Sequence, residues 1–239
     1  MLTTFFVSEG TNFSANQIEV DGDEAHHGVN VLRLKEAEEI KISDGAGNWA
    51  IGKVNQIGKK RFTVEISTRG FDPAPKQRVI AVQAILKNDA NKEAIDFLTQ
   101  VGIDEIIPWQ SQHSIGKIDS KSLSKWQSAA RESSRQSRRT RIPGIANTLS
   151  TENLISKIKD FENVFVLHEA AENRLSQIEI NEEVDVFLIV GPEGGLSEFE
   201  VNSFIAAGAK AVRLGESVLR AANAGAAATS VVMSRTGKW

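Results

Sequence analysis

The sequence contains no cysteine and no tyrosine among its 239 residues, and only five prolines. The absence of cysteine excludes disulfide frameworks, thiol nucleophiles and cysteine-ligated zinc or iron–sulfur clusters. No apolar run approaches the roughly 18 residues that a membrane-spanning helix requires, and the first residues lack the basic segment and apolar stretch of a signal peptide. We therefore expect a soluble, cytoplasmic protein that does not contact a membrane.

An excess of charge of one sign is also missing. The 28 Lys and Arg residues stand against 31 Asp and Glu residues, for a formal net charge of -3. This balance argues against a protein that coats nucleic acid indiscriminately, but it allows a local basic stripe. The four histidines form no His-Glu-x-x-His motif, so we expect no catalytic metal. A Gly-x-Ser-x-Gly elbow is absent as well, which leaves a serine hydrolase poorly supported.

Short apolar runs with period-two alternation occupy about the first 70 residues, a pattern typical of β-strands. Residues 44–48 (DGAGN) supply the positive-φ positions that a hairpin turn needs. This part of the chain therefore predicts a small β-barrel or sandwich. Residues 70–75 hold two of the five prolines, so we place a boundary there and divide the chain into domains 1–72 and 73–239.

Beyond the boundary, strand-like apolar runs alternate with segments of helical periodicity. This alternation predicts an α/β domain with a mostly parallel sheet covered by helices. One helix is clear, because Ala94, Leu98 and Val101 recur at helical spacing and Gly102 stands at the expected C-cap.

The most informative segment is 184–200. It predicts a buried strand, a glycine loop at 191–196 (GPEGGL), and a helix capped by the Ser-x-x-Glu box of Ser197 and Glu200. Open α/β sheets bind ligands at the carboxyl ends of their strands, where glycines allow close backbone approach. The spacing matches neither Walker A nor Gly-x-Gly-x-x-Gly. A ligand site and a tight turn without a ligand both remain open.

A second loop, 215–217 (GES), precedes a predicted helix that starts near Val218 and has small side chains nearly all round. Such a helix is expected to be buried in a core or at a subunit interface. Arg220 would then be a charge at the start of a buried helix, which requires a partner. The expected partner is either a protein carboxylate such as Glu193 or a bound ligand.

Residues 125–141 are rich in arginine and contain a single interspersed acid, Glu132. If this segment is helical throughout, four arginines share one face: Arg131, Arg135, Arg138 and Arg139. Such a stripe suits RNA phosphates; a solvated charged face is the alternative. His27 and Arg33 lie in a short apolar segment that by itself is typical of a surface turn.

Two motifs together carry a family resemblance: LIVGPEGGLS at 188–197 and LGESVLR at 214–220. With them, the sequence resembles the bacterial 16S ribosomal RNA uridine-N3-methyltransferases of the SPOUT superfamily. Further matches follow in chain order at 27–33, at 102–108, at Lys125-Trp126, and at Gln136-Ser137 with Arg139 and Pro143. The resemblance therefore spans both domains, from about residue 5 to residue 235.

The resemblance implies a PUA-like, RNA-binding β-barrel domain followed by a SPOUT-type α/β methyltransferase domain whose C-terminal part forms a trefoil knot. It also implies a homodimer through the knotted domain, with 16S ribosomal RNA of the small ribosomal subunit as partner and S-adenosyl-L-methionine as cofactor. The implied cofactor-binding residues are Leu167, His168, Gly191, Glu193, Gly194, Gly195, Leu196, Leu214, Gly215, Val218 and Leu219.

The resemblance also suggests catalytic residues. Arg220 is the candidate that stabilises negative charge on the target base, and Glu193 is either the base that takes the N3 proton or a structural partner of loop amides. Ala221 and Ala222 stand where the family commonly has polar residues, which leaves Asn223 as the nearest polar candidate. The implied RNA contacts are His27, Arg33, Arg131, Arg135, Gln136, Arg138 and Arg139.

Two other functions remain open on the sequence alone. One is a SPOUT methyltransferase with another RNA target, for example a ribose 2′-hydroxyl, since such enzymes share the glycine loop. The other is a non-catalytic RNA-binding factor for ribosome assembly, which the replacement by Ala221 and Ala222 favours.

Overall fold

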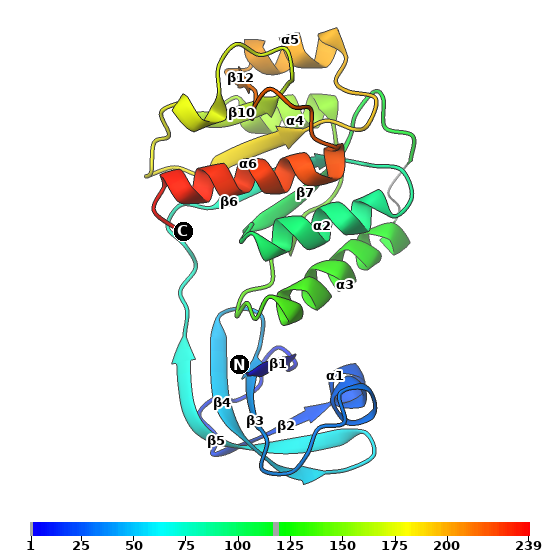
Figure 1. The fold of residues 1–239 in the computed structure, drawn as a ribbon, viewed down its shortest axis with the longest axis vertical. Coiled ribbons are helices and arrows are strands. Elements are labelled where there is room, and N and C mark those ends of the chain that lie inside the picture. Colours follow the sequence, from blue (N-terminus) through cyan, green and yellow to red (C-terminus); the bar gives the residue numbers. More distant parts are fainter. Residues whose placement is uncertain (1, 117–119) are drawn as a thin grey trace. The chain divides into compact units, whose positions relative to one another are not determined.

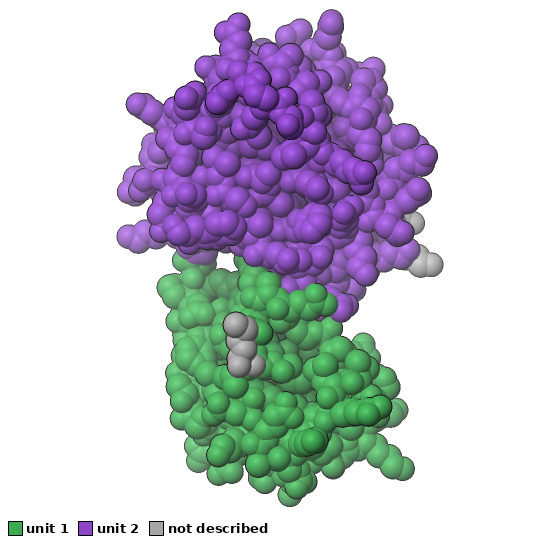
Figure 2. Space-filling view, viewed as in Figure 1, with its two compact units in different colours: residues 1–74, 134–142 green, residues 75–133, 143–239 purple. Residues whose placement is uncertain are grey.

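The computed structural model describes residues 2–116 and 120–239. The chain forms two compact units, shown in different colours in Figure 2. Unit 1 comprises Met1–Ala74 and Ser134–Ile142, and unit 2 comprises Pro75–Ser133 and Pro143–Trp239. The predicted boundary at 72/73 lies close to the observed one, but the prediction assigned residues 134–142 to the second domain, whereas they belong to unit 1. No helix in the described ranges combines the length and apolar character needed to cross a bilayer.

Unit 1 is a five-stranded sheet in the order β1-β3-β4-β5-β2, with β1 and β3 parallel and the other neighbours antiparallel. All five strands contribute side chains to one core, in which the rings of Phe5 and Phe62 meet edge to face at 5.2 Å. The hairpin predicted at 44–48 is confirmed by the β3–β4 pairing, with Gly45 and Gly47 at positive φ. The elements are β1 Thr3–Phe6, β2 Gln17–Asp21, α1 Gly22–His26, a π-helix His27–Val31, β3 Glu39–Ser43, β4 Asn48–Ile57 and β5 Arg61–Phe71.

Residues 134–142 belong to unit 1 because their backbone is bonded to the β3–β4 hairpin. Ser43 Oγ donates to the carbonyl of Thr140 at 3.0 Å, and the Ile142 amide donates to Gly45 O at 2.9 Å. Thr140 also donates through its hydroxyl to Asp72. Since Ser43 and Thr140 are 97 positions apart, local sequence patterns do not encode this pairing.

Unit 2 contains a seven-stranded parallel sheet in the order β12-β10-β11-β6-β7-β8, with β9 also paired to β7. The prediction of an α/β domain with a mostly parallel sheet is therefore confirmed. The strands are β6 Val79–Ala84, β7 Glu105–Gln110, β8 Gly144–Ile145, β9 Leu149–Ser150, β10 Asn163–Leu167, β11 Val186–Val190 and β12 Lys210–Val212. The helices are α2 Ala90–Gln100, α3 Ser120–Gln136, α4 Thr151–Ile158, a 3-10 turn Leu175–Gln177, α5 Glu198–Ala206 and α6 Ala221–Arg235.

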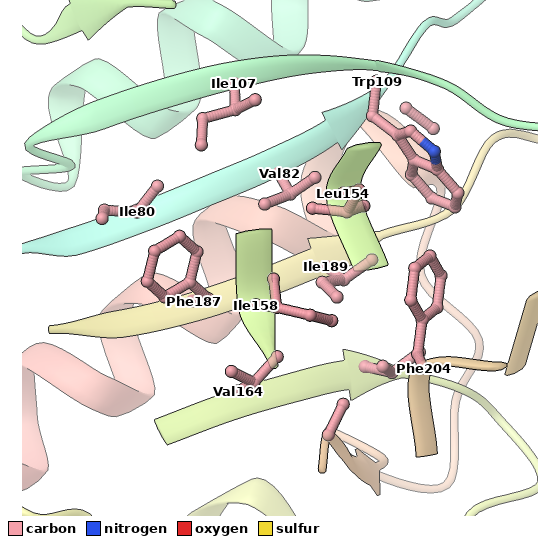
Figure 3. Packing of buried hydrophobic residues seen from close by; sticks show 13 residues of the cluster. Ile80, Val82, Ile107, Trp109, Leu154, Ile158, Val164, Phe187, Ile189 and Phe204 are labelled. Atoms are coloured by element: carbon pink, nitrogen blue, oxygen red, sulfur yellow. The ribbon is translucent and has the colours of Figure 1, made fainter. Parts of the chain in front are cut away.

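Helices cover both faces of this sheet. On one face, Leu154 and Ile158 of α4 and Phe204 of α5 pack on alternate strand residues such as Val82 and Ile189 (Figure 3). On the other face, α6 lies against β6, β11 and α2 (Figure 1). Because both faces are covered, the neighbouring strands β6 and β11 are buried along their whole length, and they are mostly apolar.

Two helix boundaries differ from the predictions. The predicted basic helix ends at Gln136, since Arg138 takes a left-handed conformation with φ of 60° and Arg139 N donates back to Ser134 O at 2.9 Å. The small-sided helix begins at Ala221 rather than near Val218. The helix at 90–100 is confirmed, with Gly102 at a φ of 97° just after it.

Candidate functional site

A cavity of about 870 Å³ lies in unit 2 where β10, β11 and β12 end. Three segments that follow these strands line it: 167–169, 190–196 and 212–222. The structure brings all of the following predicted residues to this cavity: Leu167, His168, Gly191, Glu193, Gly194, Gly195, Leu196, Leu214, Gly215, Val218, Leu219 and Arg220. The carboxyl edge of the sheet is therefore a candidate ligand site, as the sequence predicts.

The glycine loop 191–196 is tightly built. Gly195 has a φ of 72°, and its amide donates to Pro192 O at 3.0 Å. A Cβ on Gly191 would lie 2.9 Å from Leu196 Cδ2, and one on Gly194 would lie 3.2 Å from His113 Cβ. These glycines are therefore needed for the close packing of the loop itself.

The predicted capping box behind the loop is confirmed. Ser197 Oγ accepts from the Glu200 amide at 3.2 Å, while Glu200 Oε2 accepts from the Ser197 amide at 3.0 Å. Glu200 is 1% exposed, and its other oxygen accepts from the Gln112 amide at 2.7 Å. His113 Nδ1 lies 3.1 Å from Gly195 O. The segment after β7 thus holds the loop in place, which the sequence did not reveal because the partners are 82 and 88 residues apart.

Glu193 is exposed at the cavity and is tied to the segment after β6. Its Oε1 accepts from the Lys87 amide at 3.0 Å. Among the described residues no ion pair joins Glu193 to Arg220. The contact agrees with the structural alternative for Glu193, a partner of loop amides.

Arg220 is exposed, contrary to the prediction of a buried charge. It is the N-cap residue of α6, with extended φ and ψ, and its carbonyl accepts from the Asn223 and Ala224 amides. The prediction was wrong because 218–220 are not helical: Val218 is 76% and Leu219 41% exposed. Arg220 therefore lines the cavity as an exposed residue, without needing a buried partner.

Asn223 is exposed on α6 and does not line the cavity, whereas Ala221 and Ala222 do. The structure therefore does not bring Asn223 together with Arg220 at the site. Several lining residues were not predicted as site residues, and some of them directly follow strand ends, which is the signal that could have found them. They are Ala90, Glu93, Glu169, Val190, Val212, Arg213 and Ala224.

The predicted RNA contacts do not form one helical stripe. Arg131 lies on α3 in unit 2, whereas Arg138 and Arg139 follow the helix in unit 1. Arg135 has a side chain only 16% exposed, with Nη1 3.5 Å from Glu24 Oε2. The prediction of a single arginine stripe was wrong because the helix ends at Gln136. Gln136, another predicted RNA contact, is exposed.

The remaining predicted RNA contacts lie on the short helical segment of unit 1. His27 is half-buried at the start of the π-helix, and Arg33 is exposed with a φ of 55°. Gly28 lets this helix approach the core, since a Cβ there would lie 3.0 Å from the Phe5 ring. Across the described ranges, no group of three or more His, Cys, Asp or Glu residues is arranged to hold a metal ion.

Comparisons with known proteins agree with this architecture. A sequence model described as RNA methyltransferase domain matches residues 72–233, and one described as RNA methyltransferase PUA domain matches residues 20–67. The ribosomal RNA small subunit methyltransferase E of Mycobacterium bovis is 35% identical over 228 residues, covering 92% of this chain and 87% of that protein. The protein of the same name from Bacillus subtilis is 26% identical, covering 98% and 94%.

A solved structure shares the fold. The ribosomal RNA small subunit methyltransferase E of Neisseria gonorrhoeae, crystallised with S-adenosyl methionine, superposes with a TM-score of 0.88 at 24% identity over 98% of each chain. This likeness shows the fold, and the match over 20–67 confirms the PUA-like β domain; the SPOUT assignment and the trefoil knot stay predictions. The glycine-loop cavity and the two-unit fold agree with the sequence match over 72–233, and this match shows that the chain belongs to the RNA methyltransferase family.

Proposed function

We propose that this protein transfers a methyl group from S-adenosyl-L-methionine to N3 of a uridine in 16S ribosomal RNA of the small ribosomal subunit. The observation that carries the proposal is the cavity at the ends of β10, β11 and β12, in a chain 35% identical to a ribosomal RNA small subunit methyltransferase. The resemblance at 188–197 and 214–220 supplies the uridine-N3 position.

The residues at the cavity fit such a cofactor. The volume of the cavity, about 870 Å³, lies within the range of small-molecule sites. A Cβ built on Gly195 or Gly215 would meet nothing within 4 Å, so backbone borders open space at both positions. The residues that would hold the cofactor are Leu167, His168, Gly191, Glu193, Gly194, Gly195, Leu196, Leu214, Gly215, Val218 and Leu219. When bound, the cofactor supplies an electrophilic methyl group on a sulfonium, which calls for no metal.

Arg220 is the residue we assign to the reacting base. Methylation at N3 requires loss of the N3 proton, which passes to solvent water in this scheme, and negative charge then spreads to O2 and O4 of the ring. A guanidinium at the cavity that no carboxylate of the described residues engages can donate to those oxygens. Glu193 holds the loop through the Lys87 amide in this scheme, and Asn223 has no assigned step.

The RNA contacts in this proposal come from both units. His27, Arg33, Gln136, Arg138 and Arg139 belong to unit 1, and Arg131 to unit 2. Arg135 is a positioning residue, because its mostly buried side chain pairs with Glu24. The exposed Val218 and Leu219 beside the cavity support the homodimer through the α/β domain, since exposed apolar side chains of this kind mark interfaces. The cytoplasm, where ribosomes are assembled, is the proposed location.

The Arg220→Ala variant tests the chemistry. We expect the rate of methyl transfer to fall by about 10²- to 10³-fold, the usual loss for one charge-stabilising donor, while cofactor affinity changes by less than about twofold. The measurement is the formation of 3-methyluridine on small subunits that lack the modification, with calorimetric titration of S-adenosyl-L-methionine as the control. Equal losses in rate and affinity would contradict a role at the reacting base.

The Arg138→Ala and Arg139→Ala variants test the RNA surface. Removing one arginine that neutralises a phosphate should flatten the dependence of log affinity on log salt concentration by about one unit, with cofactor affinity unchanged. Fluorescence anisotropy of a labelled fragment of 16S ribosomal RNA at several salt concentrations measures this slope. An unchanged slope would show that neither arginine contacts RNA phosphates.

A second function has one observation in its favour: the apolar Ala221 and Ala222 line the cavity. A non-catalytic assembly factor would bind the cofactor and RNA without forming product. Nucleoside analysis after incubation decides among the functions, because it reports 3-methyluridine, a 2′-O-methylated nucleoside or no methylated product.

A further inference from the structure

The cavity contains an arginine that neither the sequence motifs nor the family resemblance singled out. Arg213 follows β12 directly, and its backbone is fixed on both sides by the segment 173–175. Its amide donates to Asn173 O at 2.9 Å, and its carbonyl accepts from the Leu175 amide at 3.0 Å. The position of the Arg213 side chain is therefore set by the edge of the sheet and not by a free loop.

The guanidinium of Arg213 is incompletely paired. Its Nε is buried and has no hydrogen-bond partner among the described residues. Its Nη1 lies 3.6 Å from Glu216 Oε2, a long contact to a carboxylate that is 73% exposed. The same Glu216 receives Arg174 Nη2 at 2.6 Å, so Arg174 is its close partner. The Arg213 side chain as a whole is 28% exposed, so an acceptor can approach it even though Nε itself is closed off.

The ligand that completes Arg213 has to reach it from the cavity, which Arg213 lines together with the glycine loop. This inference rests on the proposed function, because it concerns the cofactor named there. The amino-acid end of S-adenosyl-L-methionine carries the only anionic group of that molecule, a carboxylate. The planar fork of a guanidinium matches a carboxylate through two parallel hydrogen bonds.

We propose that Arg213 binds the carboxylate of the cofactor through its terminal guanidinium nitrogens, since the buried Nε is closed to a ligand. Glu216 also lines the cavity, and Arg174, which does not line it, holds the Glu216 carboxylate at 2.6 Å. Arg213 is thus a specificity-determining residue that distinguishes the intact amino-acid end from shorter or decarboxylated analogues.

The test crosses a change in the protein with a change in the ligand. Calorimetric titrations compare S-adenosyl-L-methionine with its decarboxylated analogue, for the wild type and for Arg213→Met. Removal of the ligand carboxylate should weaken binding to the wild type by about 10- to 100-fold, the worth of a charge-assisted hydrogen-bonded pair. The same removal should change binding to Arg213→Met by less than about threefold.

Matched variants make the result specific. Arg174→Met removes the other arginine of the Glu216 pair and should keep the wild-type ratio between the two ligands. Arg213→Lys keeps the positive charge without the planar fork and should show an intermediate ratio between the two ligands. If thermal melting shows that Arg213→Met does not fold, Arg213→Lys takes its place in the comparison.

The outcomes separate the two proposals. A ligand ratio that is equal in the wild type and in both Arg213 variants overturns the assignment of the carboxylate to Arg213 while leaving the cofactor site intact. Failure of the wild type to bind S-adenosyl-L-methionine at all overturns the proposed function instead, and with it the basis of this inference.

Discussion

The two loops that form the cavity are built in opposite ways. The glycine loop 191–196 is fastened at three points: by Lys87 N on Glu193, by His113 on Gly195 O, and by the capping box behind it. The loop 214–220 is exposed from residue 215 onward, and among the described residues no loop hydrogen bond between backbone groups engages 214–219. One wall of the cavity is therefore fastened at several points, whereas the other is held chiefly by the surface ion pair of Glu216 with Arg174 at 2.6 Å.

This difference matters for ligand binding. A preformed wall loses little conformational entropy when a ligand docks, whereas an exposed loop with few bonds loses more. The exposed loop also carries Val218, Leu219 and Arg220, the residues proposed to meet a second subunit or the RNA. The proposed cofactor site therefore combines a fastened glycine loop with an exposed loop whose side chains are also proposed to meet macromolecules.

The largest effect should come from breaking the fastened wall at Glu200. We expect Glu200→Ala to lower the free energy of unfolding by about 3 kcal/mol, because it removes a buried carboxylate that accepts from the amides of Ser197 and Gln112. Urea denaturation measures this loss. Ser197→Ala is the matched control, since it removes the contacts of the Ser197 hydroxyl with the Glu200 amide and carboxylate but keeps both amide bonds to Glu200, and it should cost about 1 kcal/mol. Equal losses in the two variants would show that the Gln112 bond contributes nothing.

An intermediate effect should distinguish the two loops through their glycines. Gly195→Ala forces a side chain into a left-handed conformation and should cost about 1–2 kcal/mol of stability. Gly215 is outside that region and faces open space, so Gly215→Ala should leave stability within about 0.5 kcal/mol. The added methyl group should nevertheless weaken cofactor binding about tenfold. Thermal melting and calorimetry measure both quantities, and a Gly215→Ala variant that binds normally would remove that position from the cofactor site.

The smallest effect on the fold should come from the exposed wall. Val218→Ser should change the free energy of unfolding of the monomer by no more than about 0.5 kcal/mol, because the side chain is 76% exposed. Its loss from a dimer interface should raise the dissociation constant by roughly tenfold, the worth of one buried valine. Sedimentation equilibrium over a range of concentrations measures that constant. An unchanged dissociation constant would show that Val218 is not part of the dimer interface.

Features that depend on residues close in sequence were predictable. The strand, glycine loop and capped helix at 184–200 follow from a run of apolar residues and from groups three positions apart. The hairpin at 44–48 and the helix ending before Gly102 have the same kind of origin. The cavity residues after β10, β11 and β12 were reached through the family resemblance and through the rule that parallel strands present their carboxyl ends together.

Features that depend on distant partners were not predictable. The basic segment was expected to be one helix, but at Arg138 the chain turns and pairs with the β3–β4 hairpin of unit 1. Arg220 was expected to be buried, although helix α6 starts only after it. In both cases local composition favours a longer helix. Hydrogen bonds of Thr140 and Ile142 with the hairpin accompany the end of the basic helix, whereas residues 218–220 show no comparable bond to the described parts of the chain.

The sequence by itself determined the class of the fold, the glycine loop with its cap, and the part of the cavity at 191–196 and 214–220, because each is specified by short-range spacing or by motif. Only the tertiary structure decided which carboxylates and amides fasten the loop, and that Arg213 reaches the cavity with an unpartnered Nε among the described residues. The physical reason is that a buried donor or acceptor is satisfied by whichever group folding brings within about 3 Å. For Glu193 that group is the amide of Lys87, which lies 106 residues away along the chain.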